Sequence, residues 1–110
     1  MIYENINIAL YQQDLKDLHD TIIDFTNQAP DFINKSCFGI LSNNVDRGLN
    51  EAHKSIKKQL VDLEIRFNLE LKKLVHVRLL ICKRKAKLIL IDINLNTEHE
   101  LILEDLINGK

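Results

Sequence analysis

The chain has 110 residues, of which 45% are hydrophobic and 28% are charged, with three glycines, one proline and a formal net charge of −1. This length is typical of one domain, and the scarcity of glycine and proline predicts long elements. Two cysteines exclude a disulfide-rich framework, and the absence of any apolar run approaching about 20 residues excludes a membrane-spanning helix.

The charges are segregated along the chain. Residues 1–46 carry seven acids and two bases, residues 47–87 carry twelve bases and four acids, and residues 88–110 carry five acids and one base. A near-neutral total therefore conceals a strongly basic middle between two acidic ends. Such segregation guides the choice and orientation of charged partners.

The N-terminus does not join a basic stretch to an apolar run, so no signal peptide is predicted. We therefore expect an intracellular protein, cytoplasmic or, in a eukaryote, nuclear. In such a compartment Cys37 and Cys82 are expected to be reduced thiols.

A first amphipathic helix is predicted over about residues 4–27. Apolar side chains recur there at spacings of three and four, and acidic side chains fill the outer positions. The apolar set is Ile8, Tyr11, Leu15, Leu18, Ile22 and Phe25. A stripe this narrow predicts pairing with one facing helix, as in a coiled coil.

A connector is predicted over residues 28–48, where the only proline and two of the three glycines lie. Pro30 is suited to the first position of a short helix. The apolar residues that such a helix would carry are Phe32, Ile33, Ile40 and Leu41.

A second, longer helix is predicted over about residues 48–74. Its main apolar stripe is Leu49, His53, Ile56, Leu60, Leu63, Phe67, Leu71 and Leu74. Val61, Ile65 and Leu69 form a second apolar patch on the opposite, basic side. At 1.5 Å per residue this helix would be about 40 Å long, which predicts an elongated molecule with the first helix lying antiparallel to the second.

Two alternatives remain open for residues 75–95. Apolar residues alternate with other residues in two runs, as expected of a β-hairpin, but the link over residues 83–87 is rich in lysine, which also suits a continuation of the helix. We favour the hairpin because a helix would place Arg84 inside an apolar stripe.

A short helix is predicted over residues 97–108. Thr97 and Glu100 have the spacing of a capping box, and Asn108 and Gly109 form a stop signal. The sequence as a whole therefore predicts a mainly α fold, or α+β if residues 75–95 form a hairpin, built on an elongated antiparallel pair of long helices.

No constellation for catalysis is found, and no metal site, cofactor site or small-molecule substrate is predicted. The four histidines lie far apart, and Glu98–Glu100 is better explained as an acidic helix start than as a set of metal ligands. Cys37 has no recognisable partner histidine, and no glycine-rich phosphate loop is present. We therefore expect a protein without enzymatic activity.

The patch on the second helix motivates our main functional hypothesis, a protein–protein interaction module such as a complex subunit, adaptor or inhibitor. Its partner would be another protein or further copies of the same chain. The predicted contact surface consists of Val61, Ile65 and Leu69, flanked by Lys58 and Lys72.

The alternative hypothesis is a nucleic-acid-binding accessory protein that uses residues 72–87. Bases at this density can neutralise several phosphates. The candidate contacts, to nucleic acid or to another anionic partner, are Lys73, Arg78, Lys83, Arg84, Lys85 and Lys87. The segment lacks the interleaved aromatic residues that stack single-stranded bases.

Overall fold

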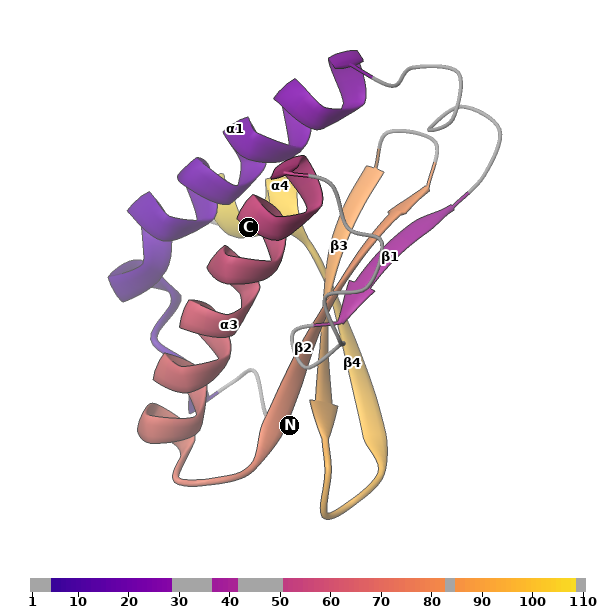
Figure 1. Ribbon diagram of the computed structural model, residues 1–110. Coiled ribbons are helices and arrows are strands. Elements are labelled where there is room, and N and C mark those ends of the chain that lie inside the picture. Colours follow the sequence, from indigo (N-terminus) through magenta and orange to yellow (C-terminus); the bar gives the residue numbers. More distant parts are fainter. Residues whose placement is uncertain (1–4, 29–36, 42–50, 83–84, 109–110) are drawn as a thin grey trace.

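In the computed structural model of the protein, helices α1, α3 and α4 lie on one face of an antiparallel sheet (Figure 1). The structure describes residues 5–28, 37–41, 51–82 and 85–108. In chain order the elements are η2 (Ile8–Tyr11), α1 (Gln12–Gln28), β1 (Phe38–Leu41), α3 (Glu51–Leu71), β2 (Val75–Cys82), β3 (Lys85–Asp92), β4 (Thr97–Ile102) and α4 (Leu103–Ile107). The strands lie side by side in the order β1-β2-β3-β4.

The centre of the sheet is the hairpin of β2 and β3, which pair from Val75 with Asp92 to Cys82 with Lys85. Every second residue of β2 is buried against the helices, and the residues between them are partly exposed on the other face. Leu88–Leu90 of β3 are buried on both faces, as expected of a central strand. Of the two alternatives for residues 75–95, the structure therefore has the hairpin.

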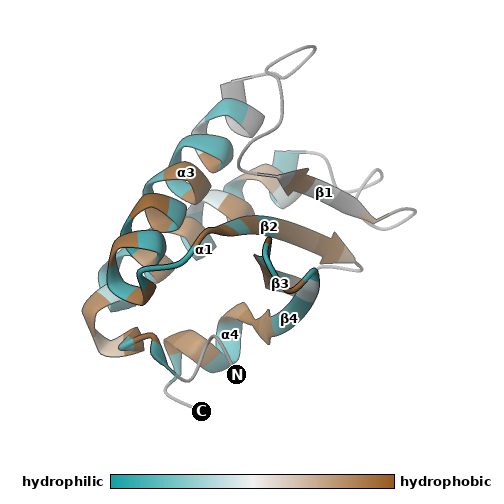
Figure 2. Cartoon of the chain, turned by 90° about the horizontal axis from the view of Figure 1, so that it is seen from below, coloured by the Kyte–Doolittle hydropathy of each residue, from teal (hydrophilic) through white to brown (hydrophobic). Residues whose placement is uncertain are grey.

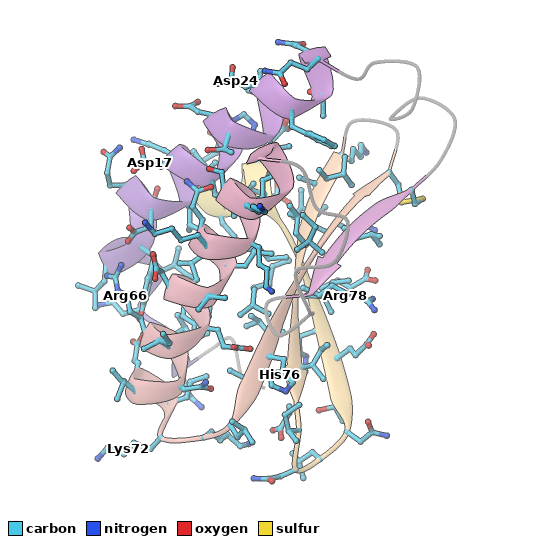
Figure 3. All side chains as sticks on the ribbon, in the orientation of Figure 1. Asp17, Asp24, Arg66, Lys72, His76 and Arg78 are labelled. Carbon is cyan, nitrogen blue, oxygen red and sulfur yellow. A yellow bond between two sulfur atoms is a disulfide. The ribbon has the colours of Figure 1, made fainter. Side chains whose placement is uncertain are left out.

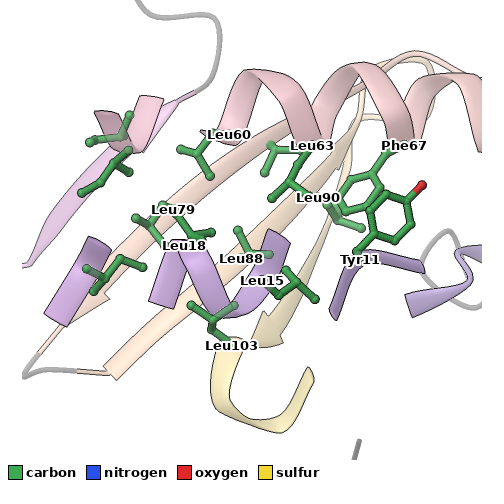
Figure 4. Packing of buried hydrophobic residues seen from close by; sticks show 14 of the residues in the cluster. Tyr11, Leu15, Leu18, Leu60, Leu63, Phe67, Leu79, Leu88, Leu90 and Leu103 are labelled. Carbon is green, nitrogen blue, oxygen red and sulfur yellow. The ribbon is translucent and has the colours of Figure 1, made fainter. Parts of the chain in front are cut away.

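The hydrophobic core lies between the sheet and the helices (Figure 4). Apolar and polar segments alternate along α1 and α3, whereas β2 and β3 are apolar over much of their length (Figure 2). The side chains of the core that are fully buried and largest are Phe67, Leu15, Leu18, Ile56, Leu60, Leu79, Ile81, Leu88, Leu90 and Leu103. Both predicted helical stripes thus contribute to one core.

The start of α1 packs against the end of α3, so the two helices are antiparallel. The Tyr11 ring meets the Phe67 ring edge-on, with 4.8 Å between the ring centroids. The Tyr11 hydroxyl donates a hydrogen bond of 2.6 Å to Glu70, and Arg66 forms an ion pair with Asp14. Burial, followed by the hydrogen bond to Glu70, raises the pKa of Tyr11 to about 12.

The predicted mainly α fold, an elongated pair of helices, is wrong. The chain forms a sheet of four strands, and α3 ends at Leu71 rather than continuing to residue 74. The helices fold across the sheet, so the radius of gyration is 13.5 Å and the principal extents are 39 × 31 × 21 Å. A radius of about 13 Å is ordinary for a chain of this length.

The predicted helix over residues 97–108 is also wrong for its first half, because residues 97–102 form strand β4. The turn that precedes it is closed by a hydrogen bond from the Leu95 N–H to the Asp92 carboxylate, 3.0 Å long, and by Asn96 in the left-handed region at φ 53°. Asparagine tolerates this conformation well. Thr97 therefore begins a strand opposite Asp92 and does not cap a helix.

The connector was predicted to carry Ile40 and Leu41 on a short helix, but both lie in strand β1, which pairs with β2. The other residues assigned to that helix, Pro30, Phe32 and Ile33, lie outside the described residues. Strand β1 could not be predicted from local sequence patterns, because its pairing partners are about 40 residues away in the sequence.

The prediction of reduced thiols is wrong as well. Cys37, just before β1, forms a disulfide with Cys82 at the end of β2, with 4.3 Å between their Cα atoms. The bridge joins the edge strand to the centre of the sheet at one end of their pairing.

Among the described residues, none of the helices has the length and apolarity needed to cross a lipid bilayer.

Candidate functional site

Helix α3 has two apolar sides with different surroundings. One side is buried against β1, β2 and α1. On the other side, Val61, Ile65 and Leu69 follow one another at intervals of four residues. Val61 is partly buried, whereas Ile65 is 52% exposed and Leu69 is 74% exposed. Neither the hairpin nor α4 covers them, because the hairpin packs on the buried side and α4 packs on α1, β3 and β4.

Lysine side chains stand at both ends of this apolar row. Lys58 and Lys72 are exposed, and Lys72 points away from the fold at the lower end of α3 (Figure 3). At 100° per residue, Lys58 and the three apolar residues fall within about 80° of arc, and Lys72 follows directly after the end of α3, beyond Leu69. We call this face the α3 ridge; it consists of Lys58, Val61, Ile65, Leu69 and Lys72.

Two polar side chains of α3 fix the helix against β2. The Asn68 side chain accepts a hydrogen bond of 2.7 Å from the Val75 N–H, and Glu64 accepts one of 3.2 Å from the Val77 N–H. Strand β1 pairs with β2 only as far as Arg78, so these two N–H groups lie beyond its end. An unpaired N–H group at such a position is costly, so Glu64 and Asn68 take the place of strand pairing.

Glu64 makes a further contact with β2, because its Oε1 lies 2.8 Å from Nδ1 of His76. No sequence pattern indicates the roles of Glu64 and Asn68. Both lie between the two apolar sides of the helix, where a polar residue is expected in any case. Their effect is to hold the α3 ridge on a rigidly oriented helix.

On its α1 side the α3 ridge borders a small hollow of about 50 Å³. The residues that line it are Asp14, Asp17, Gln59, Asp62, Leu63 and Arg66. Sites for small organic ligands usually have volumes of several hundred Å³, so this hollow does not fit a substrate.

The C-terminal end of α3 is shaped by two adjacent lysines. Lys72 lies in the left-handed region at φ 54°, which ends the helix at a position where glycine is usual. Lys73 Nζ lies 2.7 Å from a carboxylate oxygen of the fully buried Asp92. The hydrogen bond from Lys73, and after it the one from the Leu95 N–H, hold the pKa of Asp92 below its ordinary value of 3.8.

Acidification is expected to destabilise the protein through Asp92. Because the folded state lowers the pKa of this carboxyl group, its contribution to stability is present above about pH 4 and is lost as the pH falls below that value. Urea unfolding between pH 7 and pH 2.5 measures the effect. Asp92→Asn should be less stable than the wild type at pH 7 and should lose less stability on acidification; equal pH slopes for the two proteins would contradict this assignment.

Two bases of the segment predicted for nucleic-acid contact lie beside acids on the sheet. Arg78 Nη2 lies 3.9 Å from Glu98, and Lys87 Nζ lies 3.5 Å from Glu100. The first pair joins β2 to β4 and the second joins β3 to β4. Both pairs lie on the sheet face opposite the helices. Acids of the C-terminal region therefore neutralise part of the positive charge.

Lys85 lies on the same sheet face as Lys87, and the two line one hollow with Leu80 and Cys82. Lys73 is engaged with Asp92 at one end of the hairpin, and Lys85 is exposed at the other end. Lys83 and Arg84 lie outside the described residues.

A second group of exposed apolar side chains lies just before β2 and in the turn between β3 and β4. Leu74 is 52% exposed, Ile93 37% and Leu95 64%. A hydrogen bond of 3.2 Å from the Ile93 N–H to the Leu74 carbonyl joins the two segments. Lys72 and Lys73 directly precede Leu74, and Asp92 directly precedes Ile93.

Within the described residues, no three His, Cys, Asp or Glu side chains gather into a group that could hold a metal ion. Comparison of the chain with protein-family models, with curated proteins and with solved structures finds no match.

Proposed function

We propose that this protein is a non-enzymatic protein–protein interaction module, acting as a complex subunit, adaptor or inhibitor, and that it binds its partner through the α3 ridge. The observation that carries the proposal is the exposure of Ile65 and Leu69, at 52% and 74%, on a helix whose other side is in the core. Scattered apolar residues are normal on a protein surface, whereas a continuous row marks an interaction site.

The energetics support this assignment. Complete burial of an exposed leucine or isoleucine contributes about 1.5–3 kcal/mol, so covering the exposed parts of Ile65 and Leu69 contributes on the order of 3 kcal/mol. Helix α3 is already held by Glu64 and Asn68, so binding need not order it. A rigid helix with a solvent-facing apolar row is the usual form of a helix-in-groove contact.

Ile65→Asp is expected to abolish partner binding without unfolding the protein. The matched control is Ile23→Asp, which makes the same substitution at an isoleucine of α1 that is 40% exposed. Affinity capture from the native host with the two variants and the wild type provides the comparison. Capture of a partner should fall at least about 10-fold for Ile65→Asp and stay unchanged for Ile23→Asp, and both melting temperatures should stay within a few degrees of the wild type.

The proposal is wrong if both variants retain every partner of the wild type, or if both lose the same partners. The nucleic-acid hypothesis stays a prediction. No contact of the described residues favours it, because three of its four described bases lie beside acids.

A further inference from the structure

We infer that the partner segment of the α3 ridge is an amphipathic helix whose apolar stripe is flanked by acidic side chains. This inference rests on the proposed function, since it specifies the partner of that same surface. Three features of the α3 ridge carry it: its backbone, its spacing and its charge.

The backbone favours a helical partner. The ridge runs from Lys58 to the C-terminal end of α3, and a helix bonds its N–H groups internally, so it offers no strand edge to which an extended peptide could add. A partner segment on this surface must therefore satisfy its own backbone, as a helix does.

The spacing gives the same answer. Val61, Ile65 and Leu69 form a row with a spacing of four residues, which is one of the ridges that pack into the grooves of a second helix. From Lys58 to Lys72 the face extends about 21 Å, which corresponds to a partner helix of about four turns.

The charge specifies the flanks of the partner helix. Lys58 and Lys72 stand at the two ends of the row and are exposed. The acid nearest the row is Asp62, which lies toward α1 and shares a hollow with Arg66. Acidic side chains near both ends of a partner helix would meet these lysines, and such pairs fix orientation and disfavour wrong partners.

The same charges disfavour a second copy of the chain as the partner. In an antiparallel pair centred on Ile65, Val61 would face the second copy's Leu69, which is favourable. Lys58 would then face the second copy's Lys72 at both ends. In a parallel pair, each lysine would instead lie beside the same lysine of the second copy. Like charges in these positions oppose self-association.

The test is a displayed library of 18-residue helical peptides. Each peptide carries a fixed leucine stripe, and its flanking positions are randomised among Asp, Glu, Lys, Arg, Ser and Gln. The library is selected at physiological salt against the wild type, Leu69→Ser, and the double charge reversal Lys58→Glu with Lys72→Glu. Selected peptides are then titrated by fluorescence anisotropy.

The wild type should enrich Asp and Glu at the flanks, and the charge reversal should enrich Lys and Arg instead. A peptide selected on the wild type should bind roughly 10-fold more weakly to the charge reversal and about 10-fold more weakly to Leu69→Ser. The inference is overturned if the wild type retains no peptide better than Leu69→Ser does, or if the charge reversal leaves the flanking preference unchanged.

Two other measurements separate this inference from the proposed function. Sedimentation that finds a dimer dissociated by Ile65→Asp but not by Ile23→Asp would refute the acidic partner helix and leave the interaction role intact. Binding to vesicles containing phosphatidylserine that is lost in Ile65→Asp would instead identify a membrane surface as the occupant and overturn the inference. If host capture is unaffected by Ile65→Asp, the proposed function itself fails.

Discussion

Phe67→Ala is expected to destabilise the protein by about 3–5 kcal/mol, the usual cost of truncating a buried phenylalanine. Phe67 is 2% exposed on the core side of α3. Its ring packs edge-on against Tyr11, so the substitution removes an aromatic pair as well as core volume. Urea unfolding followed by far-UV circular dichroism gives the free energy of unfolding of both proteins.

Leu69→Ala is the matched control for Phe67→Ala. Leu69 lies two residues further along the same helix, but it is 74% exposed on the α3 ridge. Its truncation should change the free energy of unfolding by no more than about 0.5 kcal/mol. Similar losses of unfolding free energy for the two variants would mean that the side of α3 carrying Phe67 does not face the sheet.

Replacing both cysteines by serine, as Cys37→Ser with Cys82→Ser, is expected to destabilise the protein by about 2–4 kcal/mol. The bridge joins residues 45 positions apart, so it removes much conformational freedom from the unfolded chain. It also fastens the short edge strand β1, which has four residues, to β2.

Urea unfolding with and without dithiothreitol tests the contribution of the bridge. The wild type should lose about the same stability in dithiothreitol as the double variant loses without it, and the double variant should not respond to the reductant. An unchanged wild-type midpoint after complete reduction, verified by counting free thiols, would show that the bridge contributes nothing. The intracellular location expected from the sequence stays a prediction. Disulfides are commonest in oxidising compartments, but one bridge does not identify the compartment.

The helices could be predicted because their signal is local. The repeat of apolar residues at spacings of three and four predicted the presence of α1 and α3 and which side of each helix is buried. Leu74, which was assigned to the apolar stripe of the second helix, is instead 52% exposed beyond the end of α3. The predicted start of the first helix, near residue 4, is wrong, because residues 8–11 form a 3-10 turn and α1 begins at Gln12.

The sheet was harder to predict because it depends on contacts between distant residues. Strand β1 is short, and its assignment requires knowing that residues 38–41 pair with residues 78–81. In β4, Thr97 and Glu100 have a spacing typical of a helix start, yet Glu98 and Glu100 face Arg78 and Lys87 on the sheet. The spacing of Thr97 and Glu100 alone therefore cannot distinguish a helix start from a strand.

The candidate site was partly predictable, because part of its signal is local to one helix. Membership of the α3 ridge follows from the helical period, so Val61, Ile65 and Leu69 could be grouped from the sequence. What covers that row is a property of the whole fold, and the exposure of Ile65 and Leu69 emerges only in the structure. The support from Glu64 and Asn68 depends on where β1 ends, which no local pattern indicates.

The most direct test of the docking role of the α3 ridge is a calorimetric titration of the partner captured from the host into the wild type, Ile65→Asp and Ile23→Asp. The dissociation constant should rise at least about 10-fold for Ile65→Asp and less than about 2-fold for Ile23→Asp. Equal dissociation constants for all three proteins, with each of them folded, would contradict the claim that the partner binds on α3.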